Sequence, residues 1–125
     1  MSGFRLFEYA YANKCTVEYM PPKWSQGTIY YQIFPERFRK GNPSYAPEDC
    51  VAWGSKPTAS NFMGGNLDGI RKSLSYLAEL GVECIYLNPV FTSPSNHKYD
   101  TTDYYKVDPH FGINEDLRVL VKRST

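Results

Sequence analysis

The sequence lacks several features that would point directly to a functional class. It has only three cysteines, Cys15, Cys50 and Cys84, which lie far apart and form no Cys-x-x-Cys pair. A zinc site or a redox dithiol is therefore not expected. Three unpaired thiols fit a reducing compartment, and residues 1–5 hold no apolar stretch of the length that a signal peptide needs. We therefore expect a cytoplasmic protein.

Long apolar runs and an excess of one charge are also missing. No apolar run approaches the roughly 20 residues of a membrane helix. Fourteen Lys and Arg residues against 13 Asp and Glu residues give a net charge of +1. This balance argues against nucleic acid or an anionic membrane as the partner.

The chain is rich in apolar and aromatic residues, which make up 42% and 16% of its 125 residues. Such a composition can build a core and is not that of a disordered tail. Eleven Tyr, 9 Pro and 9 Gly residues predict many loops, with rings that pack on one side and hydrogen-bond on the other.

Hydrophobic periodicity predicts the order strand, helix, strand, helix. Residues 28–34 read as a strand buried on both faces, and residues 83–87 as a second strand. Between them, apolar residues at helical spacing predict one helix over residues 67–80, with Asn66 as its N-cap and Gly81 as its stop. A second helix is expected to begin at Asn114.

This order implies an α/β fold whose sheet is incomplete. Strands joined through helices pair in parallel, but two parallel strands do not form a stable sheet alone, and their free edges favour association. Two long polar segments, 36–65 and 92–112, follow the strands, and loops of that length are usually functional. A lone strand is expected over residues 16–20.

Five motifs follow one another along the chain: YYQIFPERF at 30–38, GGNLDGI at 64–70, GVECIYLNP at 81–89, PSNHKYDTTDY at 94–104 and PHFG at 109–112. Together they resemble the α-amylase family of glycoside hydrolases, and in particular its neopullulanase, cyclomaltodextrinase and maltogenic amylase subgroup. The resemblance covers about residues 24–123.

The resemblance implies that residues 24–125 are the first two βα units of a (β/α)₈ TIM barrel, incomplete in this chain. Residues 1–23 would then be a remnant of the β-sandwich domain that precedes the barrel in that subgroup, or a linker. A full barrel takes about 250 residues and carries its sites on the loops that follow the strands. Both long polar segments would lie on that face.

His97 and Tyr99 are the candidate substrate-binding residues. A Tyr ring can stack on the C–H face of a pyranose, and a His can hydrogen-bond its hydroxyls. The residues alone favour a simpler interpretation, in which both pack within a long loop. The resemblance implies substrate contact instead, because the matching family residues line the subsite that holds the sugar whose bond is cut.

No catalytic residue is expected in this chain. Asp100, Asp103 and Asp108 are more typical of turn and capping residues, and the resemblance implies that the nucleophile, the acid and the third carboxylate come from later barrel strands. We expect Trp24 and Trp53 to act as clamps that hold their loops in place. We expect Glu36 and Arg37 to form ion pairs with other barrel groups.

The resemblance also implies that a calcium site of some relatives is lost here, so we expect no metal or other cofactor. Four positions of that site carry Lys40, Asn42, Ala46 and Asn66 in place of the expected oxygen ligands. Calcium needs several oxygens, and their charge sets its affinity. We expect the Lys40 ammonium to replace part of the lost positive charge.

The leading interpretation is a part of a retaining glycosidase that acts through a covalent intermediate on α-1,4-linked glucans such as cyclodextrins, pullulan or starch. Action on α-1,6 bonds is left open. The 125 residues alone should be inactive. The expected ligand is an α-glucan oligosaccharide, and the free strand edges are expected to allow homo-oligomers. The alternative is a non-catalytic sugar-binding or vestigial module.

Overall fold

The computed structural model describes residues 20–125. Its strands are β1 (Tyr30–Ile33), β2 (Cys84–Leu87), β3 (Phe91–Thr92) and β4 (Asp103–Val107). Its helices are α2 (Pro35–Phe38), α3 (Leu67–Arg71), α4 (Leu74–Glu79) and α5 (Asn114–Ser124), with 3-10 turns η1 (Lys23–Ser25) and η2 (Pro43–Tyr45). The expected strand at 16–20 and most of segment 1–23 lie outside the described residues.

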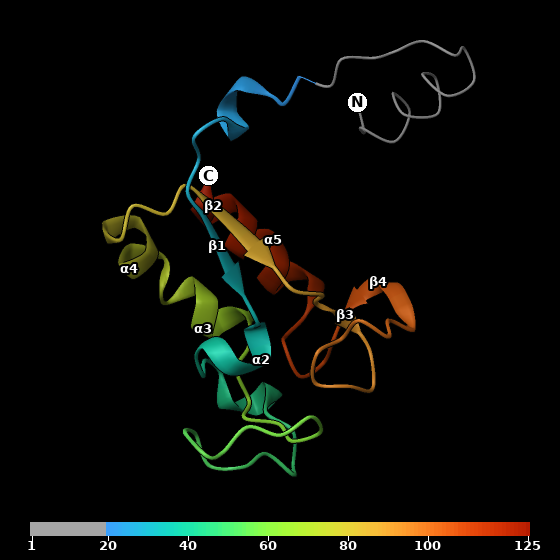
Figure 1. Ribbon diagram of the computed structural model, residues 1–125. Coiled ribbons are helices and arrows are strands. Elements are labelled where there is room, and N and C mark those ends of the chain that lie inside the picture. Colours follow the sequence, from blue (N-terminus) through green and yellow to red (C-terminus); the bar gives the residue numbers. More distant parts are fainter. Residues whose placement is uncertain (1–19) are drawn as a thin grey trace, which may run out of the picture.

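β1 and β2 pair in parallel, as the sequence predicts. Tyr30 lies opposite Cys84, and Ile33 lies opposite Leu87. Both arrows in Figure 1 point toward the same end of the molecule, where the two long polar segments lie. The carboxyl ends of the strands thus bring these segments to one end of the sheet.

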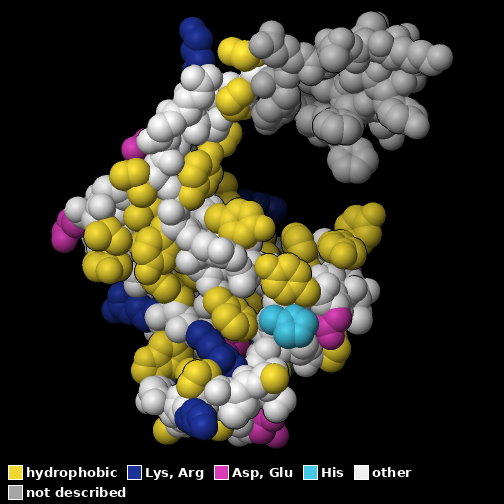
Figure 2. Space-filling model, viewed as in Figure 1, with side chains coloured by type: hydrophobic (Ala, Val, Ile, Leu, Met, Phe, Trp, Pro, Cys, Tyr) yellow, Lys and Arg dark blue, Asp and Glu magenta, His cyan; other side chains and the backbone are white. Residues whose placement is uncertain are grey.

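Only one face of this sheet is covered. Its core-facing side chains include Ile33 and Ile85, which pack with buried residues of α3, α4 and α5. On the other face Tyr30 and Tyr86 are 50% and 56% exposed, and Figure 2 shows apolar side chains at the surface over this part of the molecule. Burial on both faces was therefore a wrong expectation for residues 20–125, because α3, α4 and α5 all pack on the same face of the sheet.

The single helix predicted over residues 67–80 is two helices, α3 and α4. Asn66 caps α3 through its side chain, and Gly81 follows α4 with φ +86°, as expected. The break lies at Lys72 and Ser73. Arg39 donates from Nη1 to the Lys72 carbonyl (3.1 Å) and to Ser73 Oγ (3.0 Å), while the Ser73 hydroxyl donates to the Gly69 carbonyl.

These contacts explain the break, since a Ser hydroxyl bonded four residues back competes with the helical ladder and bends the helix. The apolar stripe also ends earlier than predicted. Leu77 is buried, but Leu80, at the end of α4, is 54% exposed.

α5 begins at Asn114, as predicted, with Glu115 and Asp116 in its first turn. The Asp116 carboxylate accepts a 2.8 Å hydrogen bond from the backbone N–H of Ile113 and so caps the helix. None of the helices in the described part of the chain has the length and apolar character that crossing a bilayer requires.

A short antiparallel hairpin, β3 and β4, lies within the segment predicted to be loop. The Asn114 side chain extends it, since its Oδ1 accepts from the Val107 N–H (2.8 Å) and its Nδ2 donates to the Tyr105 carbonyl (3.0 Å). The periodicity could not reveal this hairpin, because β3 has only two residues. In addition, β4 takes part of its hydrogen bonding from the side chain of Asn114, which lies outside the hairpin.

Candidate functional site

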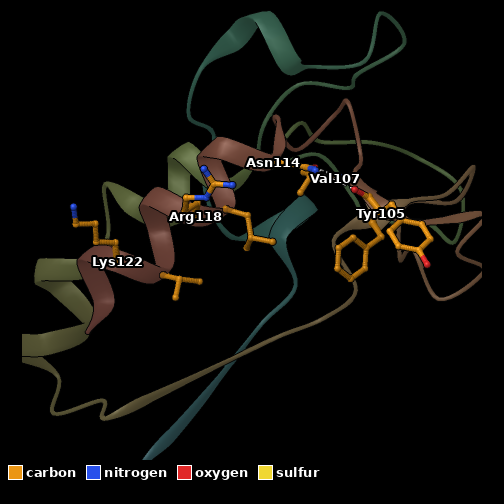
Figure 3. A pocket seen from close by; sticks show the side chains of 8 residues that line it. Tyr105, Val107, Asn114, Arg118 and Lys122 are labelled. Carbon is orange, nitrogen blue, oxygen red and sulfur yellow. Dashed lines mark hydrogen bonds between the residues drawn. The ribbon is translucent and has the colours of Figure 1, made fainter.

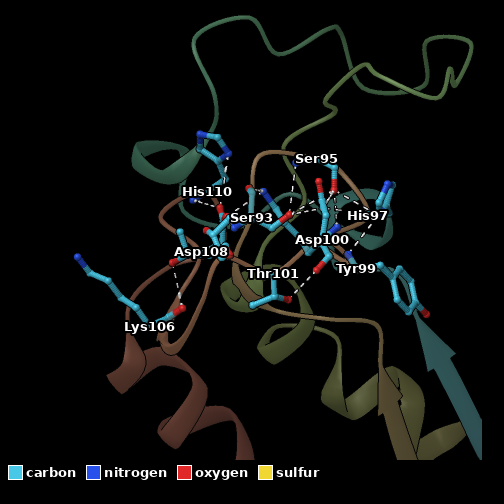
Figure 4. A network of polar contacts seen from close by, with 12 residues as sticks. Ser93, Ser95, His97, Tyr99, Asp100, Thr101, Lys106, Asp108 and His110 are labelled. Atoms are coloured by element: carbon cyan, nitrogen blue, oxygen red, sulfur yellow. Dashed lines mark hydrogen bonds and ion pairs between the residues drawn. The ribbon is translucent and has the colours of Figure 1, made fainter.

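His97 and Tyr99 lie on the turn from Ser93 to Thr101, which we call the 93–101 loop. The centres of their rings are 5.9 Å apart and the ring planes are inclined by 38°. The His97 side chain is 47% exposed and Tyr99 is 60% exposed. In Figure 4 both lie on the side of the network away from His110 and Lys106. The two candidate residues are therefore neighbours on an accessible surface.

The backbone of the loop sets the orientation of the His97 ring. Its Nδ1 atom accepts a 3.1 Å hydrogen bond from the Tyr99 N–H and lies 3.2 Å from Ser95 Oγ. In a neutral imidazole whose Nδ1 is an acceptor, the proton is on Nε2. In this tautomer Nε2 is left as the donor of a side chain that is 47% exposed.

Asp100 closes the loop on itself. Its Oδ1 accepts a 2.6 Å hydrogen bond from the Ser93 hydroxyl and a second one from the Ser95 hydroxyl. These two bonds, the Ser93 bond first, stabilise the carboxylate and lower the pKa of Asp100 below its usual 3.8. Asp100 is therefore a structural anion of the loop.

Asp103 and Asp108 are also engaged locally. Asp103 Oδ1 accepts from the Tyr105 N–H (2.9 Å), and Asp108 accepts from the backbone N–H groups of Ser93 (3.0 Å) and His110 (2.9 Å). Each is thus bonded to nearby backbone, as turn residues are. None of the three is arranged as one of two carboxyls facing across a cleavable bond.

Glu36 anchors the end of the first long polar segment. It is buried, and its Oε1 accepts hydrogen bonds from the backbone N–H groups of Met63 and Gly64 (2.7 Å for Gly64). Its other oxygen lies 3.3 Å from Arg37 Nε. Within the described residues Glu36 and Arg37 thus pair with each other, and the ion pairs expected with other barrel groups stay a prediction.

Arg37 holds the same segment from a second direction. One of its terminal nitrogens donates to the Thr58 carbonyl (2.7 Å) and to Asn61 Oδ1 (3.1 Å). From Asn61 the contact passes to the second loop, because Asn96 Nδ2 donates to the Asn61 carbonyl at 2.9 Å. The two long segments thus form one connected surface.

The aromatic residue between the loops is Phe62. Its ring meets the His110 ring edge-on, with centres 5.5 Å apart. Trp24 and Trp53, which we expected to clamp their loops, are among the exposed large side chains. Neither is a buried clamp, and Phe62 packs between the loops instead.

The four positions at which some relatives bind calcium do not suit calcium in this chain. Asn66 Oδ1 accepts from the Gly69 N–H (3.1 Å), while its Nδ2 donates to the Asn42 carbonyl (2.9 Å). Asn42 Oδ1 accepts from Ser44, and Ala46 has no oxygen in its side chain. The amides of Asn42 and Asn66 are thus engaged in hydrogen bonds within the chain, and no carboxylate at these positions is left to supply the charge that calcium binding needs.

Two further observations concern the same region. Lys40 is exposed, and its backbone forms an isolated antiparallel β-bridge with Gly65. The group that donates to the Asn42 carbonyl is the Asn66 side-chain amide. Within residues 20–125 no three His, Cys, Asp or Glu side chains come together as a metal site would require.

A hollow of about 440 Å³ lies between the β3–β4 hairpin and α5 (Figure 3). Apolar side chains such as Phe91, Leu117 and Val121 line it, together with Arg118 and Lys122. His97 and Tyr99 are not part of this lining, so the hollow and the candidate site are separate features.

Comparison with known proteins identifies the family. Residues 32–125 match the family described as alpha amylase, catalytic domain. The chain belongs to this family. It is therefore a mixed α/β part of an α-amylase catalytic domain, a TIM-barrel fold, of which the described residues contain only a partial sheet.

Sequence similarity to a cyclomaltodextrinase and a maltogenic amylase confirms the subgroup that the motifs indicate. This α-amylase-family chain is 55% identical over 106 residues to a cyclomaltodextrinase of Geobacillus thermopakistaniensis (strain MAS1). It is 51% identical over 106 residues to the intracellular maltogenic amylase of Bacillus subtilis (strain 168). Each alignment covers 84% of this chain but only 18% of the relative.

A solved structure shows the same architecture. The cyclic α-maltosyl-(1→6)-maltose hydrolase of Arthrobacter globiformis, in complex with that sugar, superposes with a TM-score of 0.82 at 40% identity. The match covers 85% of this chain and 24% of the hydrolase. This chain thus corresponds to about a fifth to a quarter of the proteins it resembles.

Sequence reasoning did not single out Lys98, Phe62 or Asn96, although all three support the loop that carries His97 and Tyr99. Lys98 is fully buried, which is rare for a lysine unless it is paired. The one signal in the sequence for the role of Lys98 was its position between the two candidate residues. Its partner Asp108 is ten residues away, so the ion pair could not be read from neighbouring residues.

Proposed function

We propose that this chain is part of the catalytic barrel of a retaining glycosidase that acts on α-glucans, and that His97 and Tyr99 contact the sugar. The observation that carries the proposal is the pairing of these two side chains. An exposed phenol ring and an exposed imidazole lie 5.9 Å apart on a loop beyond the carboxyl end of the sheet, where barrels bind their ligands.

The two rings suit complementary contacts with a glucose unit. The face of Tyr99 can cover the C–H groups of a pyranose, and the Nε2–H of His97 can donate to a sugar hydroxyl. Because the hydrogen bond from the Tyr99 N–H already orients the His97 ring, little ring freedom would be lost on binding. We assign both residues to sugar binding and neither to proton transfer or nucleophilic attack.

Barrel geometry supports the same proposal. Residues 24–125 would supply the first two βα units, and the uncovered sheet face with Tyr30 and Tyr86 would face the barrel interior, which further strands fill in such folds. Residues 1–23 would belong to a preceding domain or linker. The cytoplasm is the proposed location, as for the intracellular relative from Bacillus subtilis.

Hydrolysis needs groups that we do not assign to this chain. A retaining glycosidase uses two carboxyls about 5–5.5 Å apart, one as nucleophile and one as acid and later base. The described aspartates of the 93–108 region are bonded to their own turns. We therefore propose that the catalytic carboxylates come from the rest of the barrel, and that the enzyme cleaves α-1,4 and also α-1,6 bonds of cyclodextrins, pullulan or starch.

The source gene provides the first test. Reading it downstream of codon 125 should reveal an open frame that encodes further barrel strands. The α-amylase resemblance implies that the third strand carries an Asp-x-x-x-Asn-His signature, which should be found there. The complete enzyme should then hydrolyse cyclodextrins with retention of configuration, as followed by NMR of the released anomer. A stop codon directly after Thr125 would overturn the enzyme proposal for this molecule.

A second test addresses the sugar contacts themselves. Titrating the 125-residue chain with maltotriose should shift the NMR signals of His97 and Tyr99, without any hydrolysis. His97→Ala and Tyr99→Ala should each weaken binding, whereas Tyr105→Ala, which removes the highly exposed ring of Tyr105, should not. Binding together with a stop codon would favour the non-catalytic sugar-binding module, and binding that ignores both substitutions would contradict the assigned contacts.

A further inference from the structure

Lys98, the residue between His97 and Tyr99, is fully buried. Its exposed fraction is 0%, although its neighbours on both sides are open to solvent. A buried lysine is rare because its ammonium loses its hydration, and it is found where a partner compensates that loss. This side chain therefore needs a structural explanation.

The ammonium of Lys98 has such partners beneath the 93–101 loop. Its Nζ lies 2.9 Å from Asp108 Oδ2 and donates to the Ser93 carbonyl at 3.0 Å. It also lies 5.5 Å from the ring centre of Phe62 and 5.4 Å from that of Phe111, both within the range of a cation–π contact. One cation thus contacts the first long loop, the second long loop and the core.

Asp108 is an equally well held partner. It is 2% exposed, and its carboxylate accepts from the backbone N–H groups of Ser93 and His110. Its own N–H donates to the Val90 carbonyl at 2.9 Å. The Lys98 side chain is therefore attached to a rigid part of the fold.

The backbone of Lys98 is left-handed, with φ +64°, the only such non-glycine residue in the described chain. L residues with a long side chain seldom adopt this conformation. Its N–H donates to Ser95 Oγ (3.0 Å), and its carbonyl accepts from Thr101 Oγ1 (3.0 Å). The conformation is thus maintained at the amide, at the carbonyl and at the end of the side chain.

This conformation decides where the neighbouring side chains lie. The left-handed turn at Lys98 brings the Tyr99 N–H to His97 Nδ1 and the two rings to 5.9 Å, while the lysine itself points inward. Without the buried anchor, nothing in the side chain of residue 98 would favour a left-handed backbone.

We propose that Lys98, through its buried ion pair with Asp108, is the positioning residue that orients His97 and Tyr99 for sugar binding. This inference rests on the proposed function for the sugar itself. The pair acts on binding by holding the turn, and a displacement of about 1 Å at such a site is known to cost orders of magnitude in rate. The alternative is that the ion pair only stabilises the fold.

The test compares Lys98→Met with Lys106→Met in the 125-residue chain. The first replaces the buried ammonium by an apolar chain of similar length, and the second removes an exposed lysine of the same hairpin region. Two readouts are used: the long-range ¹H–¹⁵N correlation of the His97 ring, which reports its tautomer, and the dissociation constant for maltotriose. Signals of Ile33 and Phe111 report whether the core is intact.

We expect wild type and Lys106→Met to show the Nε2–H tautomer and equal maltotriose affinity. Lys98→Met should show mixed tautomers and a dissociation constant raised about tenfold. An intact core with the wild-type tautomer and affinity in Lys98→Met would overturn the proposal. If Lys98→Met does not fold, Asp108→Asn takes its place and the same two readouts decide.

Two further comparisons separate the possible causes. Lys98→Gly keeps the left-handed conformation without an anchor, so wild-type behaviour of this variant would overturn the role of the ion pair. The double variant Lys98→Met with Asp108→Asn should be no worse than the poorer single variant, since both act on one interaction. Full additivity would contradict that. If the wild-type chain does not bind maltotriose, the sugar contacts assigned to this chain fail, while the tautomer still tests the positioning role.

Discussion

The side-chain amide of Asn96 donates a 2.9 Å hydrogen bond to the backbone carbonyl of Asn61. These residues are 35 positions apart and belong to different long loops, each of which follows a strand of the parallel sheet. The bond therefore joins the two loops directly, next to the residues proposed to bind sugar.

Removing this amide should loosen both loops. Because Asn96 is buried, Asn96→Ala should lower the free energy of unfolding by about 1–2 kcal/mol and increase hydrogen exchange in residues 58–62 as well as 93–101. Urea unfolding and exchange mass spectrometry measure these effects. Gln26→Ala removes an exposed amide outside both loops and should change neither, and increased exchange confined to 93–101 would contradict the connection.

The buried carboxylate of Glu36 gives a second prediction. It accepts two backbone N–H groups, from Met63 and Gly64, and contacts Arg37, so its charge is well compensated. Glu36→Gln should cost about 1–3 kcal/mol of stability, measured by urea unfolding. Glu79→Gln, at an exposed position of α4, is the matched control, and equal midpoints for the two variants would argue against a structural role for Glu36.

The aspartate that closes the 93–101 loop should respond to acid in a defined direction. The Ser93 and Ser95 hydroxyls lower the pKa of Asp100 in the folded chain below the 3.8 of an unperturbed aspartate. The stabilisation is therefore present above pH 3.8 and is lost as the pH falls through the lower folded value. An NMR titration should find this low pKa.

Ser93→Ala offers a direct check, because it removes the largest cause of the shift and should move the pKa of Asp100 back toward 3.8. The same substitution should leave the lowered pKa of Asp68, in α3, unchanged. A pKa of Asp100 that stays low in Ser93→Ala would show that the hydroxyl is not its cause.

Calcium should have no effect on this chain. The Asn66 amide already donates to the Asn42 carbonyl, and no carboxylate is found among the four positions Lys40, Asn42, Ala46 and Asn66. We expect the same Tm with millimolar calcium as with a chelator, by differential scanning calorimetry. An increase in Tm with calcium that persists in Asn66→Ala would point to an ion site elsewhere, and one that disappears in Asn66→Ala would show that the calcium site of some relatives is retained here.

Local patterns were sufficient for the elements with strong periodicity. The two parallel strands, the cap at Asn66, the stop at Gly81 and the start of α5 at Asn114 all follow from side chains within a few residues of each other. These features depend on short-range hydrogen bonding and on the spacing of apolar residues, both of which are written in the order of the residues. The candidate site at His97 and Tyr99 instead follows from the resemblance of the motif at 94–104 to a known family, because the residues alone favour packing within a loop.

Long-range contacts decided the rest. Arg39 interrupts the predicted helix from 33 residues away, and Asn114 completes an edge of the hairpin that the pattern did not indicate. The ion pair with Asp108 turns the polar side chain of Lys98 inward, so that its neighbours face outward. The sequence by itself indicated which residues we propose to bind sugar, and the tertiary structure decided how they are oriented, because a buried charge takes its direction from a partner that only folding brings near.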